Sequence, residues 1–121
     1  MIPIIIFHIG NTDYLKIAIN QALSFNNIVY LIGDDSNKSF CDNHYNWLQY
    51  RNNYFEKIYK HVSPNNINFE KICIERWIII NNFMKTENIE KAFICDSDVL
   101  LYCNINNIIN EYYTNDYNLF K

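Results

Sequence analysis

The stretch Lys91-Ala-Phe-Ile-Cys-Asp-Ser-Asp-Val-Leu-Leu101 decides which fold this sequence predicts. Its apolar run, bounded by polar segments, is typical of a central strand that is covered on both faces of a sheet. Asp96 and Asp98 follow the apolar residues, and side chains two apart on a strand point to the same side. The two carboxylates should therefore emerge together at the carboxyl end of the strand, where open α/β sheets bind their ligands.

Asp96 and Asp98 are candidate metal ligands. Neighbouring carboxylates repel each other, and a hard divalent cation that is bridged to a phosphate stabilises both ionised forms. We therefore interpret the triplet Asp96-Ser-Asp98 as a site for Mn²⁺ or Mg²⁺ and a diphosphate. Because an Asp-x-Asp triplet also occurs by chance in a solvated turn, this interpretation depends on the preceding strand and on the upstream pattern.

Length and composition predict one domain, or part of one. The chain has 121 residues, and because 50% of them are hydrophobic it can bury a single core. The net charge is −3, from 10 basic and 13 acidic side chains, and no basic block occurs, which argues against a nucleic-acid partner. Since no apolar stretch is long enough to span a bilayer, we expect no transmembrane segment.

The cysteines and the N-terminus favour a reducing, cytoplasmic location. Cys41, Cys73, Cys95 and Cys103 form no Cys-x-x-Cys pair, so reduced thiols are predicted in preference to disulfides or a zinc site. The apolar N-terminal run lacks the basic flank and the small-residue cleavage site of a secretory signal.

The first third of the chain predicts a strand, a helix and a second strand. Ile2–Ile9 is an apolar strand, and Ile28–Ile32 is another. Between them lies a helix from Tyr14 to about Ser24, which Thr12 or Asp13 can cap. Such a unit forms a right-handed crossover with parallel strands. We therefore expect an α/β, Rossmann-like fold with a mainly parallel sheet and flanking helices.

Farther along the chain, the spacing of apolar residues predicts mainly helices. An aromatic stripe between Asn37 and Asn66 indicates one amphipathic helix, with a short edge strand within Lys57–Val62. The stripe comprises Phe40, His44, Trp47, Leu48, Arg51, Tyr54, Phe55 and Ile58. A long helix from Ile67 to about Lys85 is apolar nearly all round and is expected to be buried, and a short helix covers Ile105–Tyr113.

Polar residues at the ends of the first two strands are candidate binding residues. His8 and Gly10 leave the first strand, and Asp34 and Asp35 leave the second. An acid at the end of the second strand commonly binds a base or ribose. For Asp34 we favour a capping or turn role; for Asp35 both roles stay open, and a lone histidine such as His8 is more often only hydrogen-bonded. No Gly-x-Gly-x-x-Gly follows the first strand, so a dinucleotide site of that kind is not indicated.

Arg76 is a further candidate because it lies within the apolar stripe of the long helix. A buried guanidinium is costly unless it meets an anion. Its anion could be the carboxylate pair or the phosphates that the pair holds. The alternative, which carries equal weight, is that the side chain extends to solvent.

Four segments carry a resemblance when they are read together. They are Ile-Ile-Phe-His-Ile-Gly-Asn-Thr-Asp-Tyr14, Leu-Ile-Gly-Asp-Asp-Ser-Asn37, Phe-Glu-Lys-Ile-Cys-Ile-Glu-Arg-Trp77 and Phe-Ile-Cys-Asp-Ser-Asp-Val-Leu-Leu101. Their order and spacing resemble the nucleotide-binding half of GT-A type glycosyltransferases. This resemblance implies a nucleoside-diphosphate sugar as donor, with a UDP-sugar favoured, and Mn²⁺ or Mg²⁺ held against the diphosphate by Asp96 and Asp98.

The resemblance also assigns roles to other residues. Phe7 to Gly10 would line the base, Asp35 rather than Asp34 would contact base or ribose, and Ser97 would lie near the ribose or the metal. The sequence departs from the family after the Asp-x-Asp strand, where the continuation that supplies the acceptor site and any catalytic base is absent. We therefore expect residues 1–121 to form one incomplete GT-A domain, truncated at its C-terminus, with weak nucleotide binding at most.

Two other functions remain open. The Asp-Ser-Asp segment also resembles the first motif of haloacid-dehalogenase-type phosphatases, in which Asp96 would be the nucleophile and Asp98 the acid and base. In that family the motif lies near the start of the chain, whereas here it lies at residues 96–98 of 121, which argues against this function. The other alternative is a non-catalytic interaction module. Mn²⁺-dependent nucleotide binding without hydrolysis of a phosphate ester would favour the glycosyltransferase hypothesis over the phosphatase and over the non-catalytic module.

Overall fold

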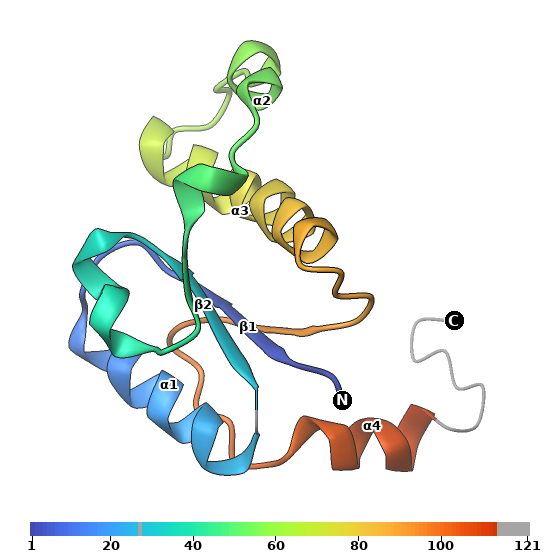
Figure 1. The fold of residues 1–121 in the computed structure, drawn as a ribbon. Helices are drawn as coiled ribbons and strands as arrows, with labels where there is room; N and C mark the ends of the chain where they lie inside the picture. Colours follow the sequence, from blue (N-terminus) through green and yellow to red (C-terminus); the bar gives the residue numbers. More distant parts are fainter. Residues whose placement is uncertain (27, 114–121) are drawn as a thin grey trace. The chain divides into compact units, whose positions relative to one another are not determined.

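The structure is a computed structural model that describes residues 1–26 and 28–113 (Figure 1). Within it the chain forms two compact units. One comprises the described residues of Met1–Tyr45 together with Lys91–Tyr113, and the other comprises Asn46–Glu90. We call them the sheet unit and the helical unit.

The sheet unit is mixed α/β, which confirms that part of the prediction. Its strands are β1 (Ile4–Phe7), β2 (Val29–Gly33), β3 (His44–Asn46) and β4 (Phe93–Cys95), in the order β3-β2-β1-β4. All four strands run parallel. The helices are α1 (Asp13–Phe25), the 3-10 helix η1 (Asp35–Phe40) and α4 (Ile105–Tyr113).

Strand alternation divides the apolar residues of the sheet between its two faces. Ile4 and Ile6 of β1 lie in one buried cluster with residues of β2 and α1, as expected for side chains two apart on a strand. The neighbours they meet there are Val29, Leu31, Leu15, Ile19 and Ala22. Helix α1 therefore covers one face of the sheet, as Figure 1 shows.

Strand β4 differs from its prediction. It has three residues and ends the described sheet beside β1, so it is an edge strand rather than a central one. Phe93 is 36% exposed because, in the described part of the chain, no strand pairs with the outer side of β4. Asp96, Ser97 and Asp98 follow the strand in a turn, so strand alternation does not govern the directions of their side chains.

The single amphipathic helix predicted between Asn37 and Asn66 is wrong, and so is the strand predicted within Lys57–Val62. The segment contains η1, β3, the 3-10 helix η2 (Trp47–Tyr50) and the helix α2 (Asn53–Ile58). Side-chain oxygens of Asn46 and Asn52 accept hydrogen bonds from the backbone N–H groups two residues on, at 3.0 and 2.7 Å. Asparagines that cap in this way compete with a continuous helix.

The long helix α3 (Ile67–Thr86) confirms its predicted span, and Asn66 caps it. The prediction that it is buried nearly all round is wrong, because Phe69 is 67% and Trp77 51% exposed. The buried residues of α3 are Glu75, Ile79, Ile80 and Phe83, all in its second half or at its middle. There the Tyr50 ring of η2 packs edge-on against Phe83, with ring centroids 5.4 Å apart.

Two further findings concern the whole described chain. All four cysteines are free thiols, in line with the predicted absence of disulfides. No helix within residues 1–26 and 28–113 combines the length and apolar character that crossing a bilayer requires.

Candidate functional site

The exits of β1 and β4 meet at one edge of the sheet, which we call the carboxyl edge. His8 follows β1, and its backbone N–H still donates to Ile32 of β2 at 3.0 Å. The Nδ1 atom of His8 lies 2.8 Å from the Oγ atom of Ser97, in the turn after β4. Parallel strands bring their carboxyl ends to the same edge, and this hydrogen bond joins the Asp96-Ser-Asp98 turn to the end of β1.

The exit of β2 lies at the same edge. The backbone N–H of Gly10 donates to Oδ2 of Asp34 at 3.0 Å, while the Ser36 N–H and hydroxyl both donate to Oδ1. Asp34 is the N-cap of η1, which agrees with the capping role favoured from the sequence. Partial burial by itself would raise the pKa of Asp34, but hydrogen bonds from Ser36, Gly10 and Asn37 outweigh it and lower the pKa.

Asn37 holds these exits together, a role that sequence reasoning missed. Its fully buried amide donates from Nδ2 to the carbonyls of His8 (2.9 Å) and Gly10 (2.8 Å). Its Oδ1 accepts from the Asp34 N–H at 3.2 Å and lies 2.9 Å from Nε2 of His44 on β3. Since an amide oxygen only accepts, Nε2 of His44 carries the hydrogen. All four hydrogen bonds that the Asn37 amide can make are therefore formed.

Two glycines make this arrangement possible. A Cβ atom on Gly33 would lie 2.1 Å from Oδ1 of Asn37, so any larger residue would displace the amide. Gly10 has φ +102°, a conformation that other residues rarely adopt. The spacing Asp34-x-x-Asn37 matches a capping box with asparagine at its last position, and that spacing is the sequence signal that could have identified Asn37.

His8 is a hydrogen-bonding group at this edge. Partial burial lowers its pKa, and the nearby Asp34 carboxylate opposes the shift only in part. Its Nε2 lies 3.0 Å from Oγ1 of Thr12, and the Tyr14 ring packs edge-on at 5.7 Å between centroids. The imidazole is thus bound at both nitrogens and fixed in orientation, so it positions the Ser97 hydroxyl.

Asp96 and Asp98 are both exposed in a turn that a hydrogen bond from Val99 N–H to the Asp96 carbonyl closes, at 3.1 Å. Burial raises the pKa of Cys95, and the charges of the two carboxylates add to the rise. Within the described residues, no three or more His, Cys, Asp or Glu side chains are grouped to hold a metal. Mg²⁺ is usually held by one or two carboxylates together with phosphate oxygens and waters. Two carboxylates alone would therefore need phosphate oxygens and waters to complete the coordination of such an ion.

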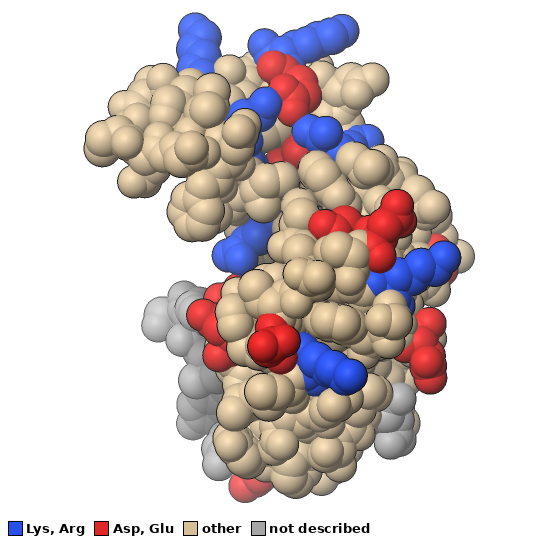
Figure 2. Space-filling view, turned by 90° about the vertical axis from the view of Figure 1, so that its left-hand side faces the viewer, with Lys and Arg blue, Asp and Glu red and all other residues tan. Residues whose placement is uncertain are grey.

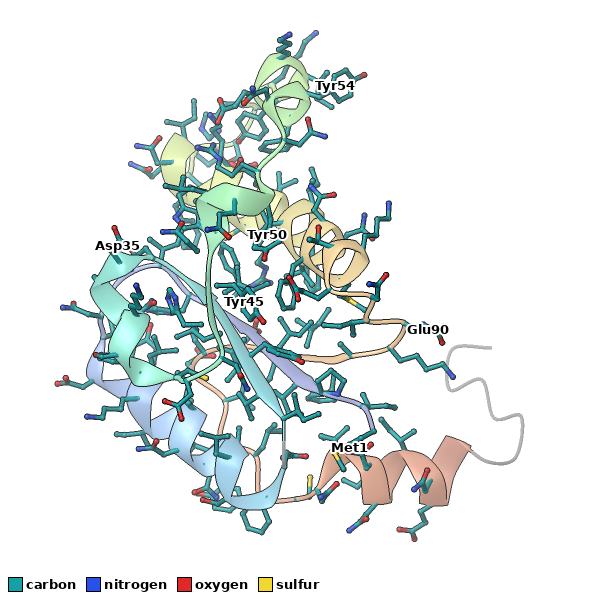
Figure 3. The ribbon with its side chains drawn as sticks, in the orientation of Figure 1. Met1, Asp35, Tyr45, Tyr50, Tyr54 and Glu90 are labelled. Atoms are coloured by element: carbon teal, nitrogen blue, oxygen red, sulfur yellow. The ribbon has the colours of Figure 1, made fainter. Side chains whose placement is uncertain are left out.

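The three remaining candidate binding residues are Phe7, Asp35 and Arg76. Phe7 ends β1 and is half-buried, and Asp35 opens η1 and is exposed at the carboxyl edge (Figure 3). Arg76 belongs to the helical unit, where its guanidinium lies over the Trp77 ring at 4.9 Å. That Arg76 meets the carboxylate pair or its phosphates stays a prediction.

Charged side chains of both signs are interspersed on the face in Figure 2. No family model, no curated protein and no solved structure matches this chain. The resemblance to GT-A type glycosyltransferases therefore stays an expectation from the sequence, and the residues of the carboxyl edge are what support any assignment.

Asp34 should make stability depend on pH. Because its pKa is lowered on folding, it contributes stability above its unfolded pKa, near 3.8, and this contribution is lost as the pH falls through the folded value. The Asp34→Asn variant should therefore be less stable than the wild type at pH 7, with a difference that narrows below about pH 4. Urea unfolding at a series of pH values measures this.

A second variant refines the test of Asp34. Ser36→Ala removes the hydroxyl that donates to Oδ1 of Asp34. The free energy of unfolding of this variant should therefore depend less on pH than that of the wild type. If the free energies of unfolding of the wild type and of Asp34→Asn differ by the same amount from pH 7 to pH 3, the ionised Asp34 carboxylate is not the cause of the stabilisation.

Proposed function

We propose that the sheet unit binds a nucleoside-diphosphate sugar at its carboxyl edge, as the donor-binding part of a GT-A type glycosyltransferase. The observation that supports this most is the 2.8 Å contact between His8 and Ser97. It brings an exposed pair of carboxylates next to the exits of the first two strands. Open α/β sheets bind nucleotides in that position.

The exits of β1 and β2 would bind the nucleoside. Phe7 to Gly10 would line the base, with Gly10 held in place through Asp34 and Asn37. Asp34 already serves as a helix cap, so Asp35, which is exposed beside it, is our candidate to accept a hydrogen bond from a ribose hydroxyl. UDP is the favoured nucleotide, on the strength of the sequence resemblance.

The turn after β4 would bind the diphosphate. Asp96 and Asp98 would hold Mn²⁺ or Mg²⁺, which when bound neutralises the charge that develops on the departing nucleoside diphosphate. His8 would keep the Ser97 hydroxyl oriented toward the ribose or the phosphates. No residue is assigned to the sugar acceptor or to deprotonating it, and the proposal concerns donor binding.

Thermal unfolding with UDP, GDP or CMP, each with and without Mn²⁺, tests the proposal. UDP with Mn²⁺ should raise the unfolding midpoint, because a ligand at 100 times its Kd adds about 2.7 kcal/mol to stability. Asp98→Asn removes one of the two carboxylates and should abolish the Mn²⁺-dependent part of that rise. The expected result is a metal-dependent shift in the wild type alone.

Asp42→Asn is the matched control, because Asp42 is exposed and precedes β3 at the other end of the strands. It should respond to UDP and Mn²⁺ as the wild type does. The proposal fails if no nucleotide shifts the wild-type midpoint, or if Asp98→Asn keeps the full metal-dependent rise.

A further inference from the structure

A pocket lies where the strands begin, at the opposite end of the sheet from the carboxyl edge. Its volume is about 450 Å³, and it is lined by Ile2, by Lys91–Phe93 at the start of β4, and by Ile105, Ile108 and Ile109 of α4. In Figure 3, Met1 and Asp35 mark the two ends of the sheet. A pocket of this volume, with mostly apolar walls, is typical of a small-molecule site.

Hydrogen bonds fix the walls of this pocket. Asn106 of α4 accepts from the Ile2 N–H at 2.7 Å and donates to the Ile2 carbonyl at 3.3 Å. At the start of α4, the buried Asn26 side chain accepts from Ile105 N–H at 2.9 Å and donates to the Cys103 carbonyl at 3.1 Å. Helix α4 is thus tied to the segment that precedes β1 on one side and to the end of α1 on the other, which holds the walls of the pocket in place.

Lys91 gives the pocket its charge. Among the described residues of the lining it is the only charged one. It is exposed, and its ammonium has no ion pair or hydrogen bond within the described part of the chain. The other lining residues offer apolar surface, which includes the partly exposed ring of Phe93. An apolar hollow beside one cation is complementary to a molecule with an apolar body and one negative charge.

We propose that this pocket binds an amphipathic carboxylate of the medium-chain fatty acid class. The alkyl chain would lie against Phe93, Ile108 and Ile109, and the carboxylate would lie near the Lys91 ammonium. The site is distinct from the carboxyl edge, since it lies at the other end of β1 and β4. Its presence does not depend on nucleotide binding.

Octanoate is the probe, and octanol is the neutral control of equal chain length. In a chain labelled at isoleucine methyl groups, octanoate should give intermolecular NOEs to Ile2, Ile105, Ile108 and Ile109. Ile17, which is 58% exposed on α1, should give none. Titration should be saturable, and Ile108→Trp, which fills the pocket, should abolish binding of both compounds, while the matched Ile17→Trp should leave it unchanged.

Lys91→Gln tests the charge. It should weaken octanoate binding by about 2- to 5-fold, the range of an exposed ion pair, and leave octanol binding unchanged. Equal effects on both compounds would overturn the preference for an anion. NOEs to Ile17 as strong as those to Ile108, or binding that survives Ile108→Trp, would overturn the site itself.

Sedimentation separates a ligand pocket from a surface that a second copy covers. The proposal expects the same oligomeric state for the wild type and for Ile108→Asp. A dimer that Ile108→Asp dissociates and octanoate does not affect would overturn the proposal in favour of a self-association surface. Because the nucleotide test uses Asp98 and Mn²⁺, either proposal can fail without the other.

Discussion

Replacing Asn37 with leucine is expected to lower the free energy of unfolding by about 3 kcal/mol or more. The leucine would leave the carbonyls of His8 and Gly10 without the amide donor, and the Asp34 N–H and His44 without the acceptor. A buried polar group stranded in this way costs about 1–3 kcal/mol. Urea unfolding followed by circular dichroism measures the loss.

Asn20→Leu is the matched control, because Asn20 is exposed on α1 and the same change there should cost no more than about 0.5 kcal/mol. Asn37→Asp separates the donors from the acceptor. It keeps the shape and the acceptor but removes both donors, so it should also destabilise the protein strongly. An Asn37→Leu variant as stable as Asn20→Leu would show that the carboxyl edge does not depend on this amide.

Much of the sheet unit could be predicted because its signals are local. The apolar run of β1, the helical spacing of α1 and the apolar run of β2 each fit within one element. The ends of the strands were less predictable. Ile2–Ile9 is apolar except at His8, yet only Ile4–Phe7 is paired as a strand, because pairing depends on where the neighbouring strands start and stop.

The segment after η1 could not be predicted from periodicity. Its aromatic residues belong to several short elements, and their helical spacing is a coincidence. Asn46 and Asn52 cap two of these elements. In a chain so rich in asparagine, composition does not distinguish a capping asparagine from a solvated one. The side-chain hydrogen bonds that decide the matter form only once the chain has folded.

The convergence of the strand ends could be predicted, but the groups that fix it could not. Parallel topology alone requires that His8, Asp34 and Ser97 share an edge. The capping-box spacing marks Asn37 as a local cap, but its burial and the need for Gly33 arise from contacts between elements, which that spacing does not show. In the helical unit, Glu75 of α3 is likewise fully buried although it is a charged residue, and its burial could not be predicted from the sequence.

Glu75 depends on a single partner. The Nε atom of Arg51 donates to its Oε1 at 2.9 Å, and within the described residues Oε2 has no hydrogen-bond partner. Arg51 also pairs with Glu56 at 2.7 Å and lies over the Trp47 ring, 4.7 Å from its centroid. Because a buried carboxylate without its cation is far more costly than an exposed one, the stability of the helical unit depends strongly on Arg51.

Arg51→Met should therefore lower the free energy of unfolding by about 3–5 kcal/mol. The variant keeps the length of the side chain and removes the charge, which strands Glu75. Tryptophan fluorescence in a urea titration measures the loss directly, because both tryptophans, Trp47 and Trp77, lie in the helical unit. Lys71→Met is the matched control, since the Lys71 ammonium pairs with the exposed Glu56 and its loss should cost much less.

The double variant Arg51→Met with Glu75→Leu identifies the cause. If the loss in the single variant comes from the stranded carboxylate, then removing that carboxylate as well should recover most of the stability, because an apolar pair can replace a buried ion pair at little cost. If the loss comes instead from the contacts of Arg51 with Trp47 and Glu56, the double variant should be no more stable than Arg51→Met. An Arg51→Met variant as stable as Lys71→Met would contradict both explanations.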